Sequence, residues 1–244
     1  MISPTLTKAK RVLRERRVLD AARTQLVGLV SAYYRLSQQR EFGSNEELFA
    51  FSSNVGLGVI RPNQIGSEFI SLLNEVQKLN PRRILEVGTA NGGTLFLLSH
   101  VAHASANIVS VDLPGGKFGE GYAWWRTPLY RRFAGKGQTI HLLRGDSHSL
   151  DIYEKIRKTV DNELFDVVFI DGDHSYDGVK KDFELYGSIV RKGGLVAFHD
   201  IAEPADPEIQ VDRFWNEIKR RYRHLEVISR VNQRGYGIGV LYVD

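Results

Sequence analysis

Acidic side chains follow a series of apolar runs between residues 84 and 200. One carboxylate stands at or just after the end of each run: Glu86, Asp112, Asp146, Asp171 and Asp200. In an open parallel sheet the ligand lies beyond the carboxyl ends of the strands, where carboxylates can bind hydroxyl groups or cations. An acid at a strand end can also cap the next helix. Five acids along one edge nevertheless predict a binding or catalytic site.

A glycine-rich turn follows the first of these acids. Gly88, Gly92 and Gly93 have the spacing G-x-x-x-G-G, and glycine lets a backbone pass close to a ligand. The spacing differs from the G-x-G-x-x-G of dinucleotide-binding folds, and no Gly-Lys-Ser/Thr phosphate loop follows. Asp112, at the end of the next run, suits the two hydroxyls of a ribose. Glu86 would repel a pyrophosphate but tolerate a cation, so an adenosyl ligand with positive charge is favoured over NAD.

Asp171, His174, His199 and Asp200 form a second group of candidate residues. The reference pKa of imidazole, about 6.5, suits a general base at neutral pH, so His174 is the predicted base and Asp171 its catalytic neighbour. Carboxylates from two adjacent strand ends can also hold a hard divalent cation such as Mg²⁺, which would lower the pKa of a substrate hydroxyl. The alternatives are structural: His174 would lie at a helix N-terminus and Asp200 in a turn.

The elements that must position these residues alternate along the chain from residue 82. Apolar runs predict strands over 84–87, 108–111, 139–143, 166–170, 194–198, 224–230 and 236–243. Helices are predicted over 94–103, 149–159, 175–190 and 211–222. Continuous apolar strands separated by helices are typical of a buried parallel sheet with helices on both faces. The last two strands are joined too closely for a crossover helix and must be antiparallel. The predicted fold is therefore α/β, a Rossmann-like seven-stranded, mostly parallel sheet with an antiparallel last strand.

Residues 1–62 are predicted to form a basic N-terminal helical extension and a pocket-closing segment, ahead of a domain over residues 63–244. Within the extension, residues 8–37 are predicted to be helical, because apolar side chains recur there at spacings of three and four. These are Leu19, Ala22, Leu26, Leu29, Tyr33 and Leu36. This apolar seam would pack on the main domain or on another subunit, so a homo-oligomer is one expectation. Residues 38–62 are expected to be irregular, and a second helix is expected over 64–79.

Glycines and aromatic side chains gather in an insertion over residues 114–137. Such a segment can form a mobile loop whose flat apolar faces stack on sugars or aromatic rings. Tyr122, Trp124 and Trp125 are accordingly predicted to bind the substrate. The alternative is that the tryptophans anchor a helix over 124–135 to the sheet.

Composition restricts the classes of protein that remain. The chain has 244 residues, 42% hydrophobic and 25% charged, near the averages for globular domains. It has no cysteine, which excludes disulfides, thiolate nucleophiles and cysteine zinc sites and fits a cytoplasmic protein. No apolar run approaches the length of a membrane span.

The positive charge is concentrated at the N-terminus. Seven of the first 24 residues are basic and two are acidic, whereas the whole chain has a net charge of +4. A basic helix can meet nucleic acid, an anionic membrane surface or an acidic partner, but it is more often a solvated helix face. Because the rest of the chain is close to neutral, a nucleic-acid partner is not expected. Peripheral contact with a membrane has no further support in the sequence.

Four segments resemble class I S-adenosylmethionine-dependent methyltransferases. These are Ile84-Leu-Glu-Val-Gly-Thr-Ala-Asn-Gly-Gly93, Val111-Asp112, Arg144-Gly-Asp146 and Asp166-Val-Val-Phe-Ile-Asp171. The stretch Phe169-Ile-Asp-Gly-Asp-His-Ser-Tyr-Asp-Gly-Val179, with Gly193-Gly-Leu-Val-Ala-Phe-His-Asp200, is similar to small-molecule and sugar O-methyltransferases. That subgroup includes macrolide-sugar O-methyltransferases and cephalosporin hydroxylase-like proteins. The resemblance covers about residues 64–243.

The resemblance implies S-adenosylmethionine as cofactor and assigns residues to it. Its site would contain Glu86, Gly88, Thr89, Asn91, Gly92, Asp112, Asp146, Ser147 and Asp171. Asp112 would hold the ribose, and Asp146 with Ser147 the adenine. In the related metal-dependent enzymes, the metal positions match Asp171, His199 and Asp200. Related sugar methyltransferases often have an acid in place of His199, and imidazole suits Mn²⁺, Fe²⁺ or Zn²⁺ better than the expected Mg²⁺.

The expected function is therefore O-methylation of a hydroxyl on a sugar or small natural product. The reaction would use S-adenosylmethionine, a divalent cation and His174 as general base. Three alternatives remain at this stage: an NAD-dependent enzyme on a similar sheet, an adenosyl-binding module without catalysis, and an RNA methyltransferase.

Overall fold

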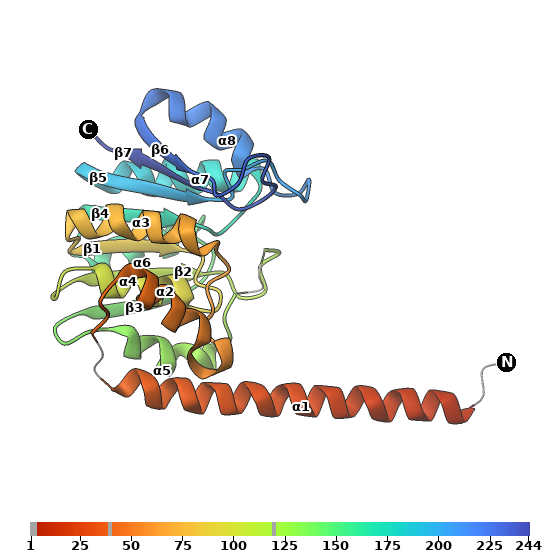
Figure 1. The fold of residues 1–244 in the computed structure, drawn as a ribbon. Coiled ribbons are helices and arrows are strands. Elements are labelled where there is room, and N and C mark those ends of the chain that lie inside the picture. The colour runs from red at the N-terminus through yellow and green to blue at the C-terminus, as the bar shows by residue number, and fades with distance from the viewer. Residues whose placement is uncertain (1–3, 39–40, 119–120) are drawn as a thin grey trace.

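A seven-stranded sheet forms the centre of the protein in the computed structural model (Figure 1). The structure describes residues 4–38, 41–118 and 121–244, with side chains from residue 20 onward except that of residue 37. The strand order is β3-β2-β1-β4-β5-β7-β6. The bounds are β1 Arg83–Val87, β2 Asn107–Asp112, β3 Thr139–Arg144, β4 Phe165–Ile170, β5 Val190–His199, β6 Arg223–Val227 and β7 Ile238–Tyr242. Strands β1 to β5 are parallel, and β7 is antiparallel to both β5 and β6. The predicted fold class is confirmed.

Helices cover both faces of the sheet because its central strands are apolar on both sides. On one face lie α2 (Asn45–Asn54), α3 (Gly66–Leu79) and α4 (Gly93–Val101); on the other lie α6 (Leu150–Thr159), α7 (Tyr176–Tyr186) and α8 (Val211–Ile218). In β1, Ile84 faces the first layer and Leu85 the second, and both are fully buried. Each layer therefore has its own hydrophobic core, and the loops at the carboxyl ends of the strands are held from both sides.

Helix α2 lies where the sequence predicted an irregular segment, and that prediction was wrong. The Ser44 hydroxyl accepts a hydrogen bond from the Glu47 backbone N–H at 3.2 Å, and the Glu47 carboxylate accepts one from the Gly43 N–H at 3.1 Å. The arrangement is a variant of the capping box, in which Glu47 bonds the residue before the N-cap. Leu48, Val55 and Ile60 share a core with α3 and α4. The proposed division at residue 62 stays a prediction.

The predicted helix over 124–135 is broken into three short pieces. They are η2 Trp124–Arg126, α5 Thr127–Tyr130 and η3 Arg131–Phe133. Tyr130 is fully buried, and its hydroxyl donates to the Ala90 carbonyl at 2.9 Å. Tyr130, rather than a tryptophan, therefore anchors this segment against the glycine-rich turn.

Helix α1 (Pro4–Ser37) confirms the predicted N-terminal helix and extends well past the body of the protein (Figure 1). Gly28 and Ala32 are buried against η1 (Val55–Gly58). Leu26 is 62% exposed, so the predicted seam does not form one packed face. Its members Leu29 and Leu36 pack on the core, whereas the side chain of Leu19 lies outside the described residues. Among the described residues, no helix combines the length and the apolar character needed to cross a membrane.

Candidate functional site

A cavity of about 570 Å³ opens at the carboxyl ends of β1 to β4. This edge is where parallel α/β sheets bind their ligands, and the volume suits a small molecule or cofactor. Its lining includes Gly88, Ala90, Asp112, Gly116, Lys117, Phe118, Gly121, Asp146, Ser147, His148, Asp171, Asp173, Glu208 and Gln210. Five predicted site residues thus line one cavity: Gly88, Asp112, Asp146, Ser147 and Asp171.

The glycine-rich turn between β1 and α4 is tightly packed against its neighbours. Gly88 has a φ of 95°, and a Cβ atom there would lie 2.0 Å from the Asp171 carbonyl oxygen. Gly92 has a φ of 80°, and its Cβ would lie 2.7 Å from the Tyr130 ring. The two glycines are thus needed for conformation and close approach. Among the described cavity residues this turn supplies Gly88 and Ala90, whereas Thr89 is buried and Asn91 exposed outside the lining.

Glu86 lies beneath the turn rather than in the cavity lining. Its carboxyl group is fully buried and accepts hydrogen bonds from Thr94 at 2.5 Å and Ser110 at 2.6 Å. Burial raises the pKa of Glu86 to about 8, although the two hydroxyl donors oppose the rise. Its predicted contact with the cofactor stays a prediction.

Asp112 ends β2 and joins two segments at the cavity wall. Its Oδ2 accepts hydrogen bonds from the backbone N–H groups of Ala90 at 2.9 Å and Tyr122 at 3.2 Å. Burial raises its pKa, opposed by these backbone donors. Asp112 therefore fixes the turn against the insertion while its side chain faces the cavity.

Asp146 and Ser147 follow β3 and line the neighbouring part of the cavity. The Asp146 carboxylate accepts from the His148 N–H at 2.8 Å, and the Ser147 hydroxyl donates to Asp182 at 2.8 Å. His148 Nε2 lies 3.2 Å from the same Asp182 oxygen. Asp182, on α7, is fully buried. Sequence reasoning missed Asp182 because it lies in the middle of a helix and meets residues 147–148 only in the fold.

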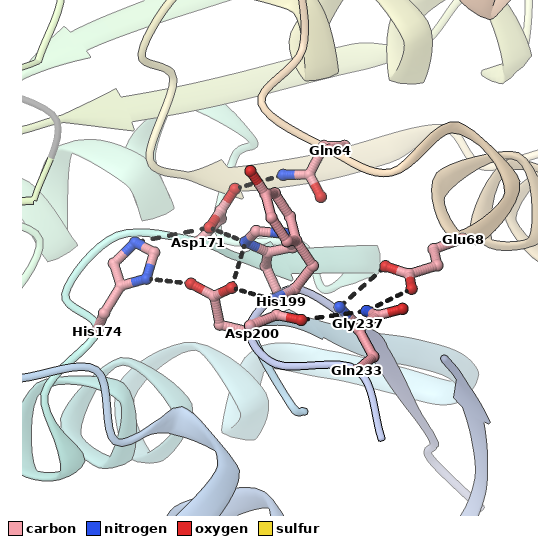
Figure 2. Close-up of polar contacts among 10 residues, drawn as sticks. Gln64, Glu68, Asp171, His174, His199, Asp200, Gln233 and Gly237 are labelled. Carbon is pink, nitrogen blue, oxygen red and sulfur yellow. Dashed lines mark hydrogen bonds and ion pairs between the residues drawn. The ribbon is translucent and has the colours of Figure 1, made fainter. Parts of the chain in front are cut away.

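Two acids and two histidines meet beyond β4 and β5 (Figure 2). His174 Nδ1 lies 2.7 Å from Asp200 Oδ2, and His174 Nε2 lies 3.7 Å from Asp171 Oδ1. His199 Nδ1 lies 3.0 Å from the same Asp171 oxygen, but without hydrogen-bond alignment. The structure thus brings together all four members of the predicted second group.

The two acids and two histidines of this cluster shift one another's pKa values. Burial alone would lower the pKa of His174, but the hydrogen bond to Asp200 and the charge of Asp171 outweigh it, so the pKa is raised. For His199, burial opposes and Asp171 favours the charged form, and the pKa rises to about 9. Burial raises the pKa of Asp200, but His174 and His199 lower it further, so the net shift is downward. Asp171 and Asp200 therefore make both imidazoles more basic.

Two further polar residues that the sequence did not single out lie beside this cluster (Figure 2). Gln64 donates a hydrogen bond to Asp171 Oδ2 at 2.8 Å, and its own Oε1 is buried with no partner among the described residues. Glu68, on α3, is 1% exposed and accepts three hydrogen bonds from the loop between β6 and β7. No local motif marks either residue, because their partners are distant in the chain.

The predicted metal ligands Asp171, His199 and Asp200 lie together, but their arrangement does not fit a cation. Both Asp200 oxygens already accept hydrogen bonds, from His174 and from the Tyr236 N–H. Within the described part of the chain, no group of three or more acidic or histidine side chains could hold a metal ion. The expected Mg²⁺ site is not supported, and no catalytic step is assigned to a cation.

The insertion after β2 reaches over the cavity, but not through its tryptophans. Phe118 lies with its ring centroid 5.2 Å from that of His174, and Lys117 pairs with Glu208 at 2.8 Å. Trp124 and Trp125 are 71% and 42% exposed, Tyr122 is buried, and all three lie outside the lining. Their predicted contact with substrate stays a prediction.

Comparison with protein families and solved structures gives a consistent result. Residues 85–201 match a family model described as a methyltransferase domain. An O-methyltransferase from Bacillus cereus, solved in complex with SAH, aligns with a TM-score of 0.56 and 19% identity over 90% of this chain and 99% of that one. TomG from Streptomyces achromogenes, an O-methyltransferase of tomaymycin synthesis solved with SAM, aligns with a TM-score of 0.56 and 19% identity over 88% and 96%. At these identities the likeness establishes the fold.

Two curated relatives match smaller parts of this chain. An uncharacterized protein, R132, of Acanthamoeba polyphaga mimivirus is 32% identical over 116 residues, which are 48% of this chain and 50% of the relative. An uncharacterized protein, y4gI, of Sinorhizobium fredii is 26% identical over 153 residues, 59% of this chain and 16% of the relative. The chain thus spans half the length of the first relative and a smaller share of the second.

Proposed function

We propose that the protein is an S-adenosylmethionine-dependent O-methyltransferase. The premise is that residues 85–201 belong to the methyltransferase-domain family and that the chain has the class I methyltransferase fold. The proposed acceptor is a hydroxyl group on a sugar or a small natural product. Two structural neighbours are O-methyltransferases solved with SAH or SAM, and one of them acts in tomaymycin synthesis, which supports this cofactor and a small-molecule acceptor.

The observation that carries the proposal is the position of His174. Asp200 engages its Nδ1 at 2.7 Å, which leaves Nε2 directed toward Asp171, and Asp171 lines the cavity. An imidazole held through one nitrogen presents the other as a base in a fixed orientation. His174 therefore has the geometry of a general base and lies beside Asp171, which lines the cavity.

The residues of the cavity fit an adenosyl cofactor. Gly88 and Ala90 bring backbone to its wall, Asp112 places a carboxylate at the end of β2, and Asp146 and Ser147 close the neighbouring end. Bound there, S-adenosylmethionine would supply a methyl group on a positively charged sulfur. We assign the ribose to Asp112 and the adenine end to residues 146–147.

His174 would then serve the acceptor side. The acceptor oxygen forms a bond to the methyl carbon as the sulfur–carbon bond breaks, and His174 Nε2 takes the hydroxyl proton. Asp200 and Asp171 stabilise the imidazolium that results, because both lie within 3.7 Å of its ring nitrogens. Alignment of the two reactants would supply most of the acceleration.

The first test is thermal unfolding with S-adenosylhomocysteine, with NADH as the comparison. A ligand at 100 times its Kd stabilises a protein by about 2.7 kcal/mol, and a domain of this size gains roughly 2–4 °C per kcal/mol. We expect a shift of several degrees with S-adenosylhomocysteine alone. A shift with NADH instead would favour an oxidoreductase and contradict the proposal.

The second test is transfer of a radiolabelled methyl group to panels of sugars, natural products, RNA and protein. Label in a small-molecule hydroxyl supports the proposal, whereas label in RNA or protein alone contradicts the acceptor class. Binding of S-adenosylhomocysteine with no transfer to any panel would favour a binding module. Parallel assays with Mg²⁺, Mn²⁺ and EDTA test the metal dependence separately.

A further inference from the structure

Glu68 is a buried carboxylate that the proposed chemistry does not use. It lies on α3 with 1% of its surface exposed. Its Oε1 accepts hydrogen bonds from the Ser229 N–H at 2.9 Å and the Gln233 side chain at 2.8 Å, and its Oε2 accepts from the Gly237 N–H at 2.9 Å. All three donors come from the loop over residues 228–237, which joins β6 to β7. A buried charge with three donors fixes that loop to α3, because leaving any of these groups unpaired would be costly.

The same loop reaches the acid–histidine cluster (Figure 2). The Tyr236 N–H donates to Asp200 Oδ1 at 2.9 Å, and the other Asp200 oxygen bonds His174. The Tyr236 ring centroid lies 5.7 Å from that of His199. A continuous path of contacts therefore leads from Glu68 through the loop and Asp200 to the proposed base.

Two residues on this path have backbone conformations in the left-handed region. Asp200 has a φ of 62° and Tyr236 a φ of 61°. The left-handed region is uncommon for residues other than glycine, less so for aspartate, and is unfavourable for a side chain such as tyrosine. Such a conformation persists only where surrounding contacts determine it, and the Glu68 hydrogen bonds on either side of Tyr236 are such contacts.

We propose that Glu68 is a positioning residue for methyl transfer, which fixes the 228–237 loop so that Tyr236 and Asp200 orient His174 toward the acceptor. This inference rests on the proposed function of His174. Because no residue of the 228–237 loop lines the cofactor cavity in the described structure, Glu68 acts on the acceptor side alone. It touches neither reactant and acts through Asp200.

The variant that tests this is Glu68→Gln, which keeps the shape but replaces one acceptor oxygen with an amide donor. That donor would face the Gly237 N–H or the donors on Oε1, so at least one hydrogen bond is lost. We expect kcat to fall about tenfold to a hundredfold, as for modest misplacement of a catalytic group. The Kd for S-adenosylhomocysteine should stay within about twofold, in keeping with a loop that does not touch the cavity.

Two further variants keep the test decisive. Gln233→Ala removes one donor from the loop side, leaves Glu68 charged, and should lower kcat in the same manner but less. Glu75→Gln is the matched control, since Glu75 lies on the same helix but bonds Lys78 and Tyr242. It should change neither constant. If Glu68→Gln does not fold, Gln233→Ala and the control decide the question.

A readout without turnover separates this inference from the proposed function. The side-chain ¹⁵N resonances of His174 and His199, recorded at one pH, report the hydrogen bonding of each ring. They should move in Glu68→Gln and Gln233→Ala but not in Glu75→Gln, even if no acceptor is ever methylated. Unchanged imidazole resonances, or equal losses of kcat and S-adenosylhomocysteine affinity, would overturn the positioning role.

Discussion

His174 owes its proposed role to its neighbours rather than to its ring alone. Nδ1 is occupied by Asp200, and the side chain is only 17% exposed. We predict that His174→Gln lowers kcat by about 10²- to 10⁴-fold, the range expected for loss of a general base. The Kd for S-adenosylhomocysteine should change little, because His174 is not among the described cavity residues. Methyl-transfer assays and calorimetry measure the two effects.

His141→Gln is the matched control for that substitution. His141 lies on β3, outside the described lining of the cavity, and makes no contact with the acid–histidine cluster that the structure describes. Activity in His141→Gln should equal that of the unmodified protein. Full activity in His174→Gln would remove His174 from the mechanism.

Glu86 predicts a dependence of stability on pH. Its folded-state pKa of about 8 exceeds its ordinary value of 4.5, because burial disfavours the charged form. The folded state therefore keeps a proton that the unfolded state releases. The contribution of the Glu86 proton to the free energy of unfolding is fully present below pH 4.5 and is lost as the pH rises toward 8. We predict that Glu86→Gln, which stays neutral, loses less stability between pH 5 and pH 8.

Denaturant unfolding at several pH values checks this expectation. Asp112 and His199 also have raised pKa values, but they are present in both proteins, so the difference in pH dependence between Glu86→Gln and the unmodified protein reports on Glu86. Glu154→Gln, at an exposed position on α6, serves as the control. Equal slopes for Glu86→Gln and the unmodified protein would mean that Glu86 is ionised in the fold.

At the scale of elements, the turn after β1 packs against the segment after β4 so closely that residue 88 must be glycine. A Cβ at Gly88 would lie 2.0 Å from the Asp171 carbonyl oxygen, and this contact is between backbone segments that cannot swing aside. We predict that Gly88→Ala destabilises the protein by several kcal/mol, as overpacking and left-handed strain combine. It should also abolish the thermal shift with S-adenosylhomocysteine, since Asp171 and the turn both line the cavity.

Gly193→Ala separates strain from overpacking. Gly193 also has a positive φ, 73°, but its Cβ would meet only the flexible end of Arg191 at 3.2 Å. It lies in the irregular part of β5, between the pairs that Val190 and Leu195 form with β4. We expect a cost of about 1–2 kcal/mol from strain alone and an unchanged ligand shift. Similar losses in both variants would mean that contact with Asp171 is unimportant.

The elements also explain what the sequence could and could not predict. The strands were predictable because runs such as Val167–Ile170 are apolar on both faces, and Asp112 and Asp171 follow from where such strands end. Gln64 and Glu68 were not predictable, because their partners lie more than 100 residues away in the chain. The capping box of α2 was present in the sequence, but the nearby glycines obscured it.

The insertion over residues 114–137 also has features that composition alone could not predict. Residues 116–118 of this segment line the cavity, and Phe118 lies beside His174. Composition could not decide which rings face the cavity. That depends on how Tyr130 packs against Gly92, and on the backbone hydrogen bond that holds Tyr122 to Asp112. Both contacts are tertiary.

At the scale of the whole molecule, α1 is joined to the body through its C-terminal part. Gly28 packs so closely on η1 that a Cβ would lie 2.4 Å from the Gly56 carbonyl oxygen, and Ala32 is fully buried beside it. Arg132 adds a hydrogen bond and a cation–π contact to Tyr33. The N-terminal part of the helix extends past the body (Figure 1).

We predict that Gly28→Val detaches α1 without disabling the cofactor site. The valine side chain would meet backbone at Gly56, so the helix must move rather than a side chain. Amide hydrogen exchange over residues 20–37 should become faster, because the contact that holds this stretch is lost. The S-adenosylhomocysteine shift should persist, since no described residue of α1 lines the cavity. Val27→Ala, at a 53% exposed position one residue away, should leave exchange unchanged. Loss of the ligand shift in Gly28→Val would instead mean that α1, acting through η1 and Gln64, helps to hold Asp171 at the site.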